Sequence, residues 1–476
     1  MELSKDLRSR QEARELAAAG ERAARALAEL PQEKLDEIVA AVASAFAAQA
    51  EKLAEEAVKE TGFGNIPDKT TKNKFASLTL LDALKGKKYV GLLREDEEKG
   101  VWEYGVPVGV IAAIVPSTNP TSTVCYKAMI ALKSGNAIIF SPHPNAAGCT
   151  RRAAQIVAEA AEAAGAPRGS VGCLSIPELA GCQELMAAPQ TRLILATGGP
   201  GMVRAAYSSG KPAIGVGAGN GPAYIHHSAD VPRAMEDILT SKTFDFGTVC
   251  ASEQSILVEK GMEEAVVREG KRLGFYFLTS QEAKKLAQAI FLPSGGINPK
   301  VVGKPAEHLA QLAGFSVPEG TKILVARENE AGPAGPYTRE KLCPVLALFV
   351  LSSEEAVLQK AIEVLDREGS GHTFSIHAAD QAVIRRFAAK IPVSRFLVNT
   401  PATQGGIGAT TGLFPAMTLG CGAVGGSSSS NNISPMDLIN IRRVAFGRRV
   451  HPPKARVELT PELLETLTQR ILERLG

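Results

Sequence analysis

Hydrophobic residues in the first part of the chain recur at helical spacing. Within residues 4–61, positions such as Leu35, Ile38 and Phe46 fall on one face between charged residues, which predicts two amphipathic helices separated near Pro31. An amphipathic helix buries its apolar face, so we expect both helices to cover another layer of the fold.

From residue 107 the pattern changes to short β-branched runs that alternate with alanine-rich stretches. The first runs are VGVIAAIV at 108–115 and AIIF at 137–140, and this alternation is typical of a parallel α/β fold. Further strands are predicted at 171–176, 192–196, 222–226, 253–258, 345–350, 372–377 and 395–399. Helices are predicted at 145–163, directly after the TGGPG loop, and at 231–240, 262–272, 354–365 and 379–389. We therefore expect two successive α/β units, the first of a nucleotide-binding kind.

Three segments fall outside this alternation. The charged residues 92–105 predict an exposed hairpin and INIRRVAF at 439–446 predicts a strand, and together they would suit an oligomerisation flap. Residues 412–432 are too rich in Gly and Ser for regular structure. Because elements follow them, a binding loop is favoured over a linker.

Composition and charge exclude several classes of partner. The 476 residues are 45% hydrophobic, 22% charged and 5% aromatic, with a formal net charge of +3, as in ordinary soluble proteins. No stretch combines Lys and Arg with aromatic residues, and no apolar run is long enough to cross a membrane. The first residues also lack the apolar core of a signal peptide. We expect neither nucleic acid nor a membrane as a partner.

The cysteines point to a reduced protein with one candidate nucleophile. The seven cysteines are odd in number, scattered and never in a C-x-x-C pair, which argues against a disulfide framework or a metal site and favours a cytoplasmic location. Six of them lie in apolar or Gly-rich contexts typical of inert thiols. Cys250 ends FDFGTVC, in a small-residue loop between a helix and a strand, where a thiolate could meet a substrate. By local context alone, an inert thiol is the commoner alternative here too.

Two further segments suggest a ligand site at the ends of strands. VPSTNPTST at 115–123 places Asn119 after a strand, where its amide could donate to a developing oxyanion. Taken alone, a turn-forming Asn before Pro is the commoner explanation. The TGGPG loop at 197–201 opens a helix and its N–H groups could bind a phosphate, although this signal is weaker than G-x-G-x-x-G.

Six segments together resemble the CoA-acylating branch of the aldehyde dehydrogenase superfamily over residues 4–446. They are PVGVIAAIVPSTNPTST, AIIFSPHPNA, ATGGPGMVRAAYSSGKP, FDFGTVCASEQS, EKLCPV and TLGCGAVGG, in the order and at the spacing of that branch. The resemblance implies an α/β fold with a Rossmann-type cofactor domain, a second α/β catalytic domain and a small oligomerisation flap. It assigns residues 1–91 and 107–221 to the cofactor domain, 222–432 to the catalytic domain, 92–106 and 433–449 to the flap, and 450–476 to a C-terminal tail.

The resemblance also implies a reaction. Cys250 would attack an aldehyde, the amide of Asn119 and the backbone N–H of Cys250 would bind the oxyanion, and a hydride would pass to a nicotinamide dinucleotide. Hydrolytic relatives carry an E-L-G-G segment whose Glu activates water, whereas this chain has VGAG with Val216 at that position. We therefore expect the Cys250 thioester to pass reversibly to the thiol of coenzyme A. His372 in SGHTF is the candidate acceptor of the CoA thiol proton, with a structural histidine at a strand end as an equal alternative.

The cofactor contacts are likewise implied by resemblance. They are Pro116, Ser117, Ser141, Pro142, His143, Pro144, Thr197, Gly198, Gly199 and Glu340. Hydrolytic relatives carry K-P-S-E where this chain has SPHP, so the carboxylate that binds a ribose hydroxyl and repels a 2′-phosphate is missing at Pro144. We expect NAD as cofactor, and NADP stays open. Glu340 in EKLCPV matches the Glu that holds the nicotinamide ribose.

The tail beyond residue 446 carries a predicted amphipathic helix. Pro452 and Pro453 interrupt the chain, Thr460 can cap a helix and Pro461 suits its first position. One apolar stripe is formed by Leu463, Leu464, Leu467, Ile471, Leu472 and Leu475. The stripe either packs on the enzyme or a neighbouring subunit, or docks to shell proteins, because acylating enzymes of bacterial microcompartments resemble this chain and often carry such a helix.

The substrate and the assembly stay open at this point. Candidate aldehydes are acetaldehyde, propionaldehyde and sulfoacetaldehyde, and the resemblance implies homodimers or homotetramers built through the flap. The alternatives are a non-acylating aldehyde dehydrogenase, a glutamyl-phosphate-type reductase, and a non-catalytic shell-associated protein. Val216 and SPHP oppose the first, and the presence of Cys250, Asn119 and Glu340 opposes the last.

Overall fold

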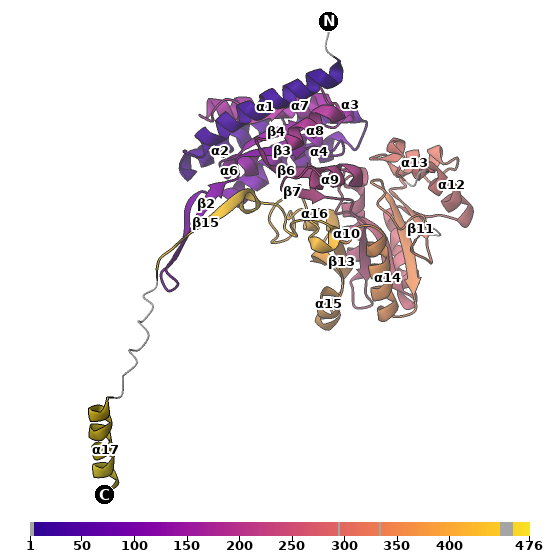
Figure 1. Ribbon diagram of the computed structural model, residues 1–476. Coiled ribbons are helices and arrows are strands. Elements are labelled where there is room, and N and C mark those ends of the chain that lie inside the picture. Colours follow the sequence, from indigo (N-terminus) through magenta and orange to yellow (C-terminus); the bar gives the residue numbers. More distant parts are fainter. Residues whose placement is uncertain (1–3, 294–295, 333–334, 448–459) are drawn as a thin grey trace.

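The computed structural model describes residues 4–293, 296–332, 335–447 and 460–476. Within these residues the strands form three sheets, and helices cover two of them (Figure 1). Both large sheets are parallel, so the chain has the α/β fold that the sequence predicts.

The first sheet has five parallel strands in the order β5-β4-β3-β6-β7. Its strands are β3 (Val110–Ile114), β4 (Ala137–Ser141), β5 (Val171–Cys173), β6 (Thr191–Thr197) and β7 (Ala213–Val216). Every residue of β3 and β4 is buried, because helices cover both faces of the sheet, and the sequence there is continuously apolar. The hydrophobic pattern predicts four of these strands and misses the short β7.

Three helices, not two, precede residue 62. They are α1 (Lys5–Leu27), α2 (Gln32–Ala48) and α3 (Ala50–Thr61). The predicted break near Pro31 is present, but a second break occurs at Gln49, whose φ of −107° leaves the helical region. Buried Phe46, Ala50 and Leu53 keep helical spacing across that second break, so the apolar pattern does not reveal it.

Helix α6 (Pro120–Lys133) is absent from the pattern-based expectation because all 14 of its residues are buried. A helix surrounded by protein has no polar face and therefore no amphipathic period. Lys127 is tolerated there since its Nζ donates to the carbonyl oxygens of Ile114 at 2.8 Å and Leu195 at 3.0 Å, at the ends of β3 and β6.

The other helical segments of this unit lie around the same sheet. They are α4 (Ile66–Lys74), η1 (Phe75–Thr79), α5 (Leu80–Leu84), η2 (Pro144–Ala146), α7 (Ala147–Ala163), α8 (Leu179–Ala187) and α9 (Pro200–Tyr207). Segments α4, η1 and α5 follow one another without interruption, with a π-helical turn at η1. The hydrophobic pattern does not predict α4, α5 or α8. In α4 the reason is that buried lysines break the apolar period.

The second sheet has seven parallel strands in the order β10-β11-β12-β9-β8-β13-β14. Its strands are β8 (Gly221–Ile225), β9 (Glu253–Glu259), β10 (Phe275–Phe277), β11 (Ile323–Arg327), β12 (Val345–Leu351), β13 (Gly371–His377) and β14 (Val393–Val398). Its helical segments are α10 (Val231–Thr243), η3 (Phe244–Gly247), η4 (Lys260–Met262), α11 (Glu263–Leu273), α12 (Ser280–Ile290), η5 (Pro299–Val301), α13 (Ala306–Leu312), α14 (Glu354–Arg367), α15 (Gln381–Ala388) and α16 (Ala402–Gly406). The hydrophobic pattern does not predict β10, β11, α12, α13 or α16.

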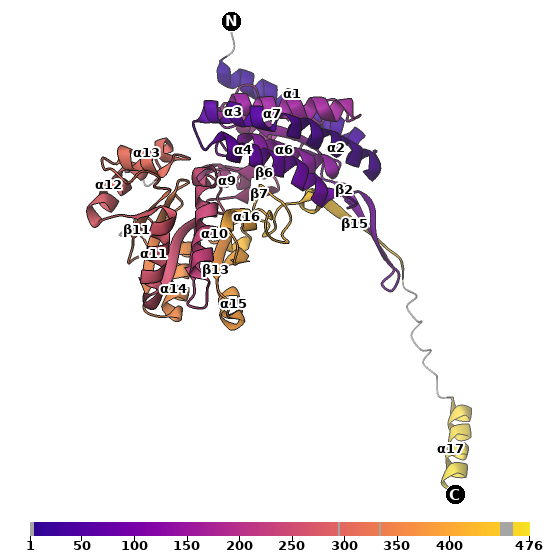
Figure 2. The same ribbon diagram turned by 180° about the vertical axis from the view of Figure 1, so that it is seen from behind.

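The third sheet is a three-stranded antiparallel flap. It consists of β1 (Gly91–Asp96), β2 (Val101–Pro107) and β15 (Ile439–Ala445), which come together from segments more than 330 residues apart. Short turns η6 (Ala423–Gly425) and η7 (Pro435–Leu438) precede β15. The flap projects away from the body in both ribbon views (Figures 1 and 2).

The last described element is α17 (Pro461–Leu475), which lies apart from the body (Figures 1 and 2). Thr460 caps it, since its hydroxyl accepts the N–H of Leu463 at 3.3 Å. The linker prolines at 452 and 453 lie outside the described residues. Among the described helices, none has the length and apolar character needed to cross a membrane.

Candidate active site

A cavity of about 250 Å³ opens between the two parallel sheets. Segments that follow β3, β6 and β7 line it from the carboxyl edge of the first sheet, where open parallel sheets bind ligands. Cys250 and Glu340 line it from the other side, just before strands β9 and β12 of the second sheet begin. The cavity therefore combines a ligand-binding edge from one sheet with a nucleophile from the other.

Most of the predicted site residues meet in this cavity. The lining includes Pro116, Ser117, Asn119, His143, Thr197, Gly198, Gly199, Cys250 and Glu340. Ser141 ends β4, Pro142 follows it and Pro144 begins η2, and these three residues do not line the cavity. Additional lining residues that the sequence analysis did not single out include Thr123, Thr248, Ile407, Met417 and Leu419.

His372 lies outside this cavity. It is the second residue of β13 and is completely buried, with Nδ1 2.8 Å from the Thr373 hydroxyl. Its Nε2 has no hydrogen-bond partner in the part of the chain that the structure describes. Burial, and then the charge of Arg395, lower its pKa to about 3, so it is neutral and a very weak base at neutral pH. Neither its position nor its pKa supports the expected role of accepting a proton from CoA, and the structural alternative fits better.

The position of Cys250 is set by a close contact with Gly219. A Cβ atom at residue 219 would lie 1.8 Å from the carbonyl oxygen of Cys250, so only glycine fits there. The N–H of Gly219 also donates to Glu340 Oε1 at 2.8 Å. One short segment between β7 and β8 thus holds the thiol loop and the carboxylate on the same side of the cavity.

The Cys250 thiol is protonated in this structure at neutral pH. Burial raises its pKa to about 12, and the carboxylate of Glu340 adds to this effect. The guanidinium of Arg395 and the backbone N–H of Cys250 act in the opposite direction. Glu340 is itself affected, since burial raises its pKa to about 8. Cys250 is the one partly exposed cysteine of the seven that lines the cavity, and therefore the one that a substrate can reach.

Asn119 directs its amide toward the thiol loop. It immediately precedes α6, and its Nδ2 lies 3.3 Å from the carbonyl oxygen of Thr248 and 3.2 Å from the hydroxyl of Thr118. Both distances are long for a hydrogen bond, so the N–H groups can be redirected to a stronger acceptor. A substrate oxygen that gains negative charge beside Cys250 would be such an acceptor.

The residues that line the other end of the cavity fit a dinucleotide. The buried hydroxyl of Thr197 has no hydrogen-bond partner among the described residues. Helix α9 begins three residues later at Pro200, so its N-terminal end, which favours anions, borders the cavity. A Cβ at Gly199 or Gly217 would meet no atom within 4 Å, so the backbone there borders open space. Glu340 faces this space from the second sheet.

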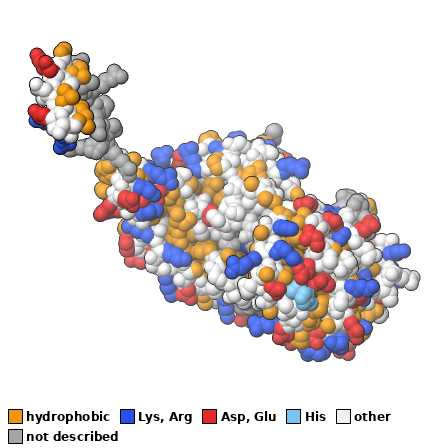
Figure 3. All heavy atoms as spheres, turned by 90° about the horizontal axis from the view of Figure 1, so that it is seen from below, with side chains coloured by type: hydrophobic (Ala, Val, Ile, Leu, Met, Phe, Trp, Pro, Cys, Tyr) orange, Lys and Arg blue, Asp and Glu red, His pale blue; other side chains and the backbone are white. Residues whose placement is uncertain are grey.

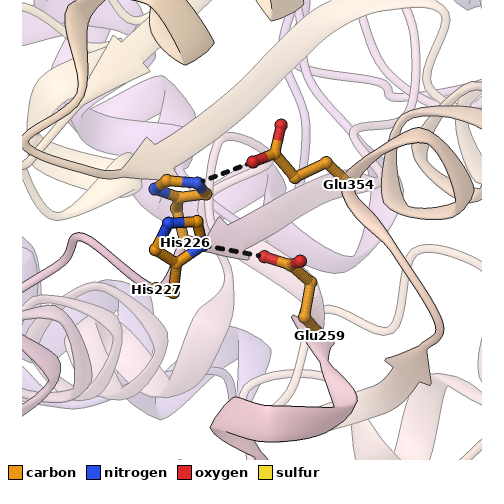
Figure 4. A group of neighbouring side chains, drawn as sticks. All are labelled: His226, His227, Glu259 and Glu354. Atoms are coloured by element: carbon orange, nitrogen blue, oxygen red, sulfur yellow. Dashed lines mark hydrogen bonds and ion pairs between the residues drawn. The ribbon is translucent and has the colours of Figure 1, made fainter.

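A second group of polar side chains lies after strands β8, β9 and β12. Ligand-type atoms of His226, His227, Glu259 and Glu354 lie within 4.8 Å of one another (Figure 4). The ring of His226 is already bonded on both sides, at 2.8 Å to the Ser228 hydroxyl and at 3.1 Å to Glu354. The Ser228 hydroxyl accepts the backbone N–H groups of Ala379 and Asp380, so its own proton is donated to Nδ1 of His226. The ring proton of His226 is therefore on Nε2 and is donated to Glu354. These hydrogen bonds connect the ends of neighbouring strands, and this structural role explains the group.

Sequence reasoning missed the charged groups beneath Asn119. Lys69 and Lys72 of α4 are buried next to it, and each forms an ion pair with the buried Asp245 of η3. Two sequence features could have revealed this charged group. One is Asp245 within the nucleophile segment FDFGTVC, and the other is the pair Lys69 and Lys72, three residues apart. Lysines on a helix ordinarily indicate a solvent-exposed face, and only the fold shows that these face the core.

Comparison with known proteins places this site in a family. The profile of the aldehyde dehydrogenase family matches residues 5–273. The bifunctional aldehyde-alcohol dehydrogenase AdhE of Escherichia coli K12 is 46% identical over 429 residues, which are 89% of this chain and 48% of that protein. The chain therefore spans about half the length of the aldehyde-alcohol dehydrogenases that it matches.

Solved structures agree in both fold and sequence. An acetylating aldehyde dehydrogenase from Geobacillus thermoglucosidasius is 49% identical with a TM-score of 0.93, covering 95% of this chain and 100% of that one. A propionaldehyde dehydrogenase from Rhodopseudomonas palustris, solved with bound CoA and an acylated cysteine, is 27% identical with a TM-score of 0.82, covering 91% of this chain and 97% of that one. From its fold, its site and these matches, the chain belongs to the aldehyde dehydrogenase family.

Proposed function

We propose that this protein is a CoA-acylating aldehyde dehydrogenase that oxidises a short-chain aldehyde to an acyl-CoA. The observation that carries the proposal is the cavity in which Cys250 faces Asn119 while Val216 occupies the wall. Val216 ends β7 and is only 4% exposed, so the position at which hydrolytic relatives hold their base offers no proton acceptor here. In this proposal residues 1–91 and 107–221 bind the cofactor, and residues 222–432 supply the nucleophile.

The residues of the cavity suit each step of this reaction. The Cys250 thiol would first release its proton to solvent in the cavity. The thiolate would then add to the aldehyde carbon, and the Asn119 amide and the Cys250 N–H would stabilise the oxyanion. A bound nicotinamide dinucleotide would supply the hydride acceptor, held by Pro116, Ser117, Thr197, Gly198, Gly199 and Glu340. The acyl group would stay on Cys250 as a thioester, and exchange with the thiol of CoA changes the bond energy little, so the reaction would be reversible.

The first choice of dinucleotide is NAD. The Glu that disfavours a 2′-phosphate in hydrolytic relatives is replaced by Pro144, but Glu60 of α3 brings another carboxylate close by. Its two oxygens accept the N–H groups of Gly148 at 2.8 Å and Cys149 at 2.7 Å at the start of α7. A carboxylate at this place would repel the charge of a 2′-phosphate bound nearby, which favours NAD over NADP.

The cavity wall favours a small uncharged aldehyde. Ile407, Met417 and Leu419 contribute apolar surface near Cys250, and no Lys or Arg is found among the described residues that line the cavity. An anionic aldehyde such as sulfoacetaldehyde would lose its hydration without gaining a cation. Acetaldehyde and propionaldehyde are therefore the proposed substrates.

We expect activity to depend strictly on CoA. With propionaldehyde and NAD, NADH should form continuously only when CoA is present, and Cys250→Ala should abolish it while leaving the fold intact. The measurement is NADH absorbance, repeated with NADP and with sulfoacetaldehyde, together with circular dichroism of the variant. Sustained turnover without CoA, or an active Cys250→Ala variant, would contradict the proposal.

The fate of the thioester should change when a carboxylate is placed at position 216. We predict that Val216→Glu raises the yield of free acid relative to acyl-CoA by at least about tenfold, since a placed general base typically contributes 10²–10⁴-fold. Free acid and acyl-CoA are quantified from the same reaction by chromatography. Val216→Gln has a similar size without the basic group and serves as the matched control. An equal product ratio for the two variants would show that the missing base is not what prevents hydrolysis.

The flap supports the proposal of homo-oligomers, dimers or tetramers. Strand β15 forms one edge of the flap and β14 forms one edge of the seven-stranded sheet. Neither pairs with another described strand on its outer side. The aromatic pair Trp102 and Phe446, with ring centroids 4.8 Å apart, stiffens the far end of the flap. An exposed strand edge is a ready template for pairing with another chain.

The tail supports a proposal about location. None of the residues of α17 is buried, and its apolar stripe is exposed, from 36% at Leu463 to 81% at Leu475 (Figure 3). An apolar stripe without a partner within its own chain is typical of a helix that docks into a groove of another protein. We propose that α17 binds shell proteins and brings this cytoplasmic enzyme into a bacterial microcompartment.

Substitutions on the two faces of α17 test whether its apolar stripe docks to shell proteins or is only exposed to solvent. In full-length protein fused at its N-terminus to a fluorescent protein and co-expressed with microcompartment shell proteins, the wild type should form puncta. Leu467→Glu with Ile471→Glu should disperse them, because charges on the stripe cannot enter an apolar groove. Thr466→Glu with Gln469→Glu adds the same charge on the opposite face and should leave the puncta unchanged. Equal fluorescence patterns for all three proteins would rule out the docking role.

A further inference from the structure

Two buried lysines lie beneath the loop that carries Asn119. Lys69 and Lys72 are 2% and 1% exposed, on the same face of α4, and both form ion pairs with the completely buried carboxylate of Asp245. Lysine is rarely buried unless its ammonium group is paired, so this arrangement requires an explanation beyond packing.

Asp245 is held rigidly between the two halves of the protein. Its Oδ1 accepts the N–H of Asn65 at 2.9 Å, and its own N–H donates to Asp68 at 2.7 Å. Its Oδ2 accepts the hydroxyl of Thr248 at 2.6 Å, two residues before Cys250. The approach is so close that a Cβ at Gly64 would lie 1.8 Å from Oδ1. Asp245 has a φ of 49°, a left-handed conformation that is uncommon for a residue other than glycine.

Lys72 settles the orientation of the Asn119 side chain. Its Nζ donates to Asn119 Oδ1, to Asp245 Oδ2 and, at 3.3 Å, to the hydroxyl of Thr248. An ammonium group can only donate, so the atom of Asn119 that faces it must be the amide oxygen. The amide nitrogen is then forced to the other side, toward Thr248 and the cavity, which is the orientation an oxyanion donor needs.

The charge of Lys72 also persists under working conditions. Burial lowers its pKa to about 8, against the opposing effect of Asp245, so most Lys72 side chains are protonated at neutral pH. In a dry interior a cation bonded to the amide oxygen polarises the amide and makes its N–H groups better donors.

Lys69 offers a natural control. Its Nζ donates to Asp245 Oδ2 at 2.9 Å and to the backbone oxygen of Thr118 at 2.9 Å. Like Lys72, it lies on α4, is buried and pairs with Asp245. Unlike Lys72, its ammonium group does not donate to the Asn119 side chain.

We propose that Lys72, held by its counter-ion Asp245, is a positioning residue that fixes the Asn119 amide with its nitrogen toward Cys250. The proposal rests on the proposed role of Asn119 as oxyanion donor. It implies that an ion pair between α4 and the nucleophile loop assembles the oxyanion hole when the two halves of the protein meet.

The test compares Lys72→Met with Lys69→Met in CoA-dependent aldehyde oxidation. Each substitution removes one cation and leaves the other paired with Asp245, so both variants should fold with similar losses of stability. For Lys72→Met we expect kcat to fall about 10- to 100-fold with little change in KM for the aldehyde. This is less than the roughly 10²–10³-fold cost of removing an oxyanion donor, because the Asn119 amide stays present and loses only its fixed orientation. For Lys69→Met we expect less than about a threefold change in kcat. Equal losses of kcat in the two variants would overturn the proposal.

A double-mutant cycle with Asn119→Ala separates this inference from the proposed function. If Lys72 acts through Asn119, Lys72→Met should cost nothing further in the Asn119→Ala background. A full additional loss in that background would overturn the positioning role and leave the function standing. An Asn119→Ala variant with wild-type kcat would instead remove the oxyanion role itself. Lys72→Gln keeps a donor for the Asn119 oxygen, should recover part of the loss, and takes the place of Lys72→Met if that variant does not fold.

Discussion

The contact between the backbones of Gly219 and Cys250 is the constraint on which the active site depends. Gly219 lies in the short connection from β7, the last strand of the first sheet, to β8, the first strand of the second sheet. Its contact with Cys250 therefore fixes the position of the nucleophile relative to both sheets. Through this contact the thiol is placed opposite the carboxyl edge of the first sheet. The hydrogen bond from Gly219 to Glu340 then adds the carboxylate to the same wall.

Charge is distributed unequally around this contact. The cavity itself contains no Lys or Arg among its described lining residues, whereas the layer behind Asn119 contains Lys69, Lys72 and Asp245. In the proposed function the cavity without cations accommodates an uncharged aldehyde. In the proposed positioning role Lys72, paired with Asp245, orients the Asn119 amide that acts on this aldehyde. The Cys250 thiol is protonated at neutral pH, because desolvation raises its pKa to about 12.

The sequence predicts much of this arrangement, and the failures have physical causes. Apolar runs identify the central strands, and the motifs around Asn119, Thr197, Cys250 and Glu340 identify residues that the fold brings into one cavity. Helix α6 is not predicted from the sequence, because it is buried on all sides and has no polar face. Helix α4 is not predicted, because its lysines are buried in ion pairs with Asp245, a residue more than 170 positions away in the sequence. His372 was singled out because histidine titrates near neutrality, but burial in β13 removes that property.

The central claim is that the oxidised aldehyde stays on Cys250 until CoA removes it. The most direct measurement is mass spectrometry of the intact protein and of the Cys250 peptide after incubation with propionaldehyde and NAD in the absence of CoA. The account predicts a mass increase of one propionyl group on Cys250 that requires NAD, persists during the incubation and disappears when CoA is added. An unmodified Cys250 under these conditions, or an adduct that is lost to water as fast as to CoA, would contradict it.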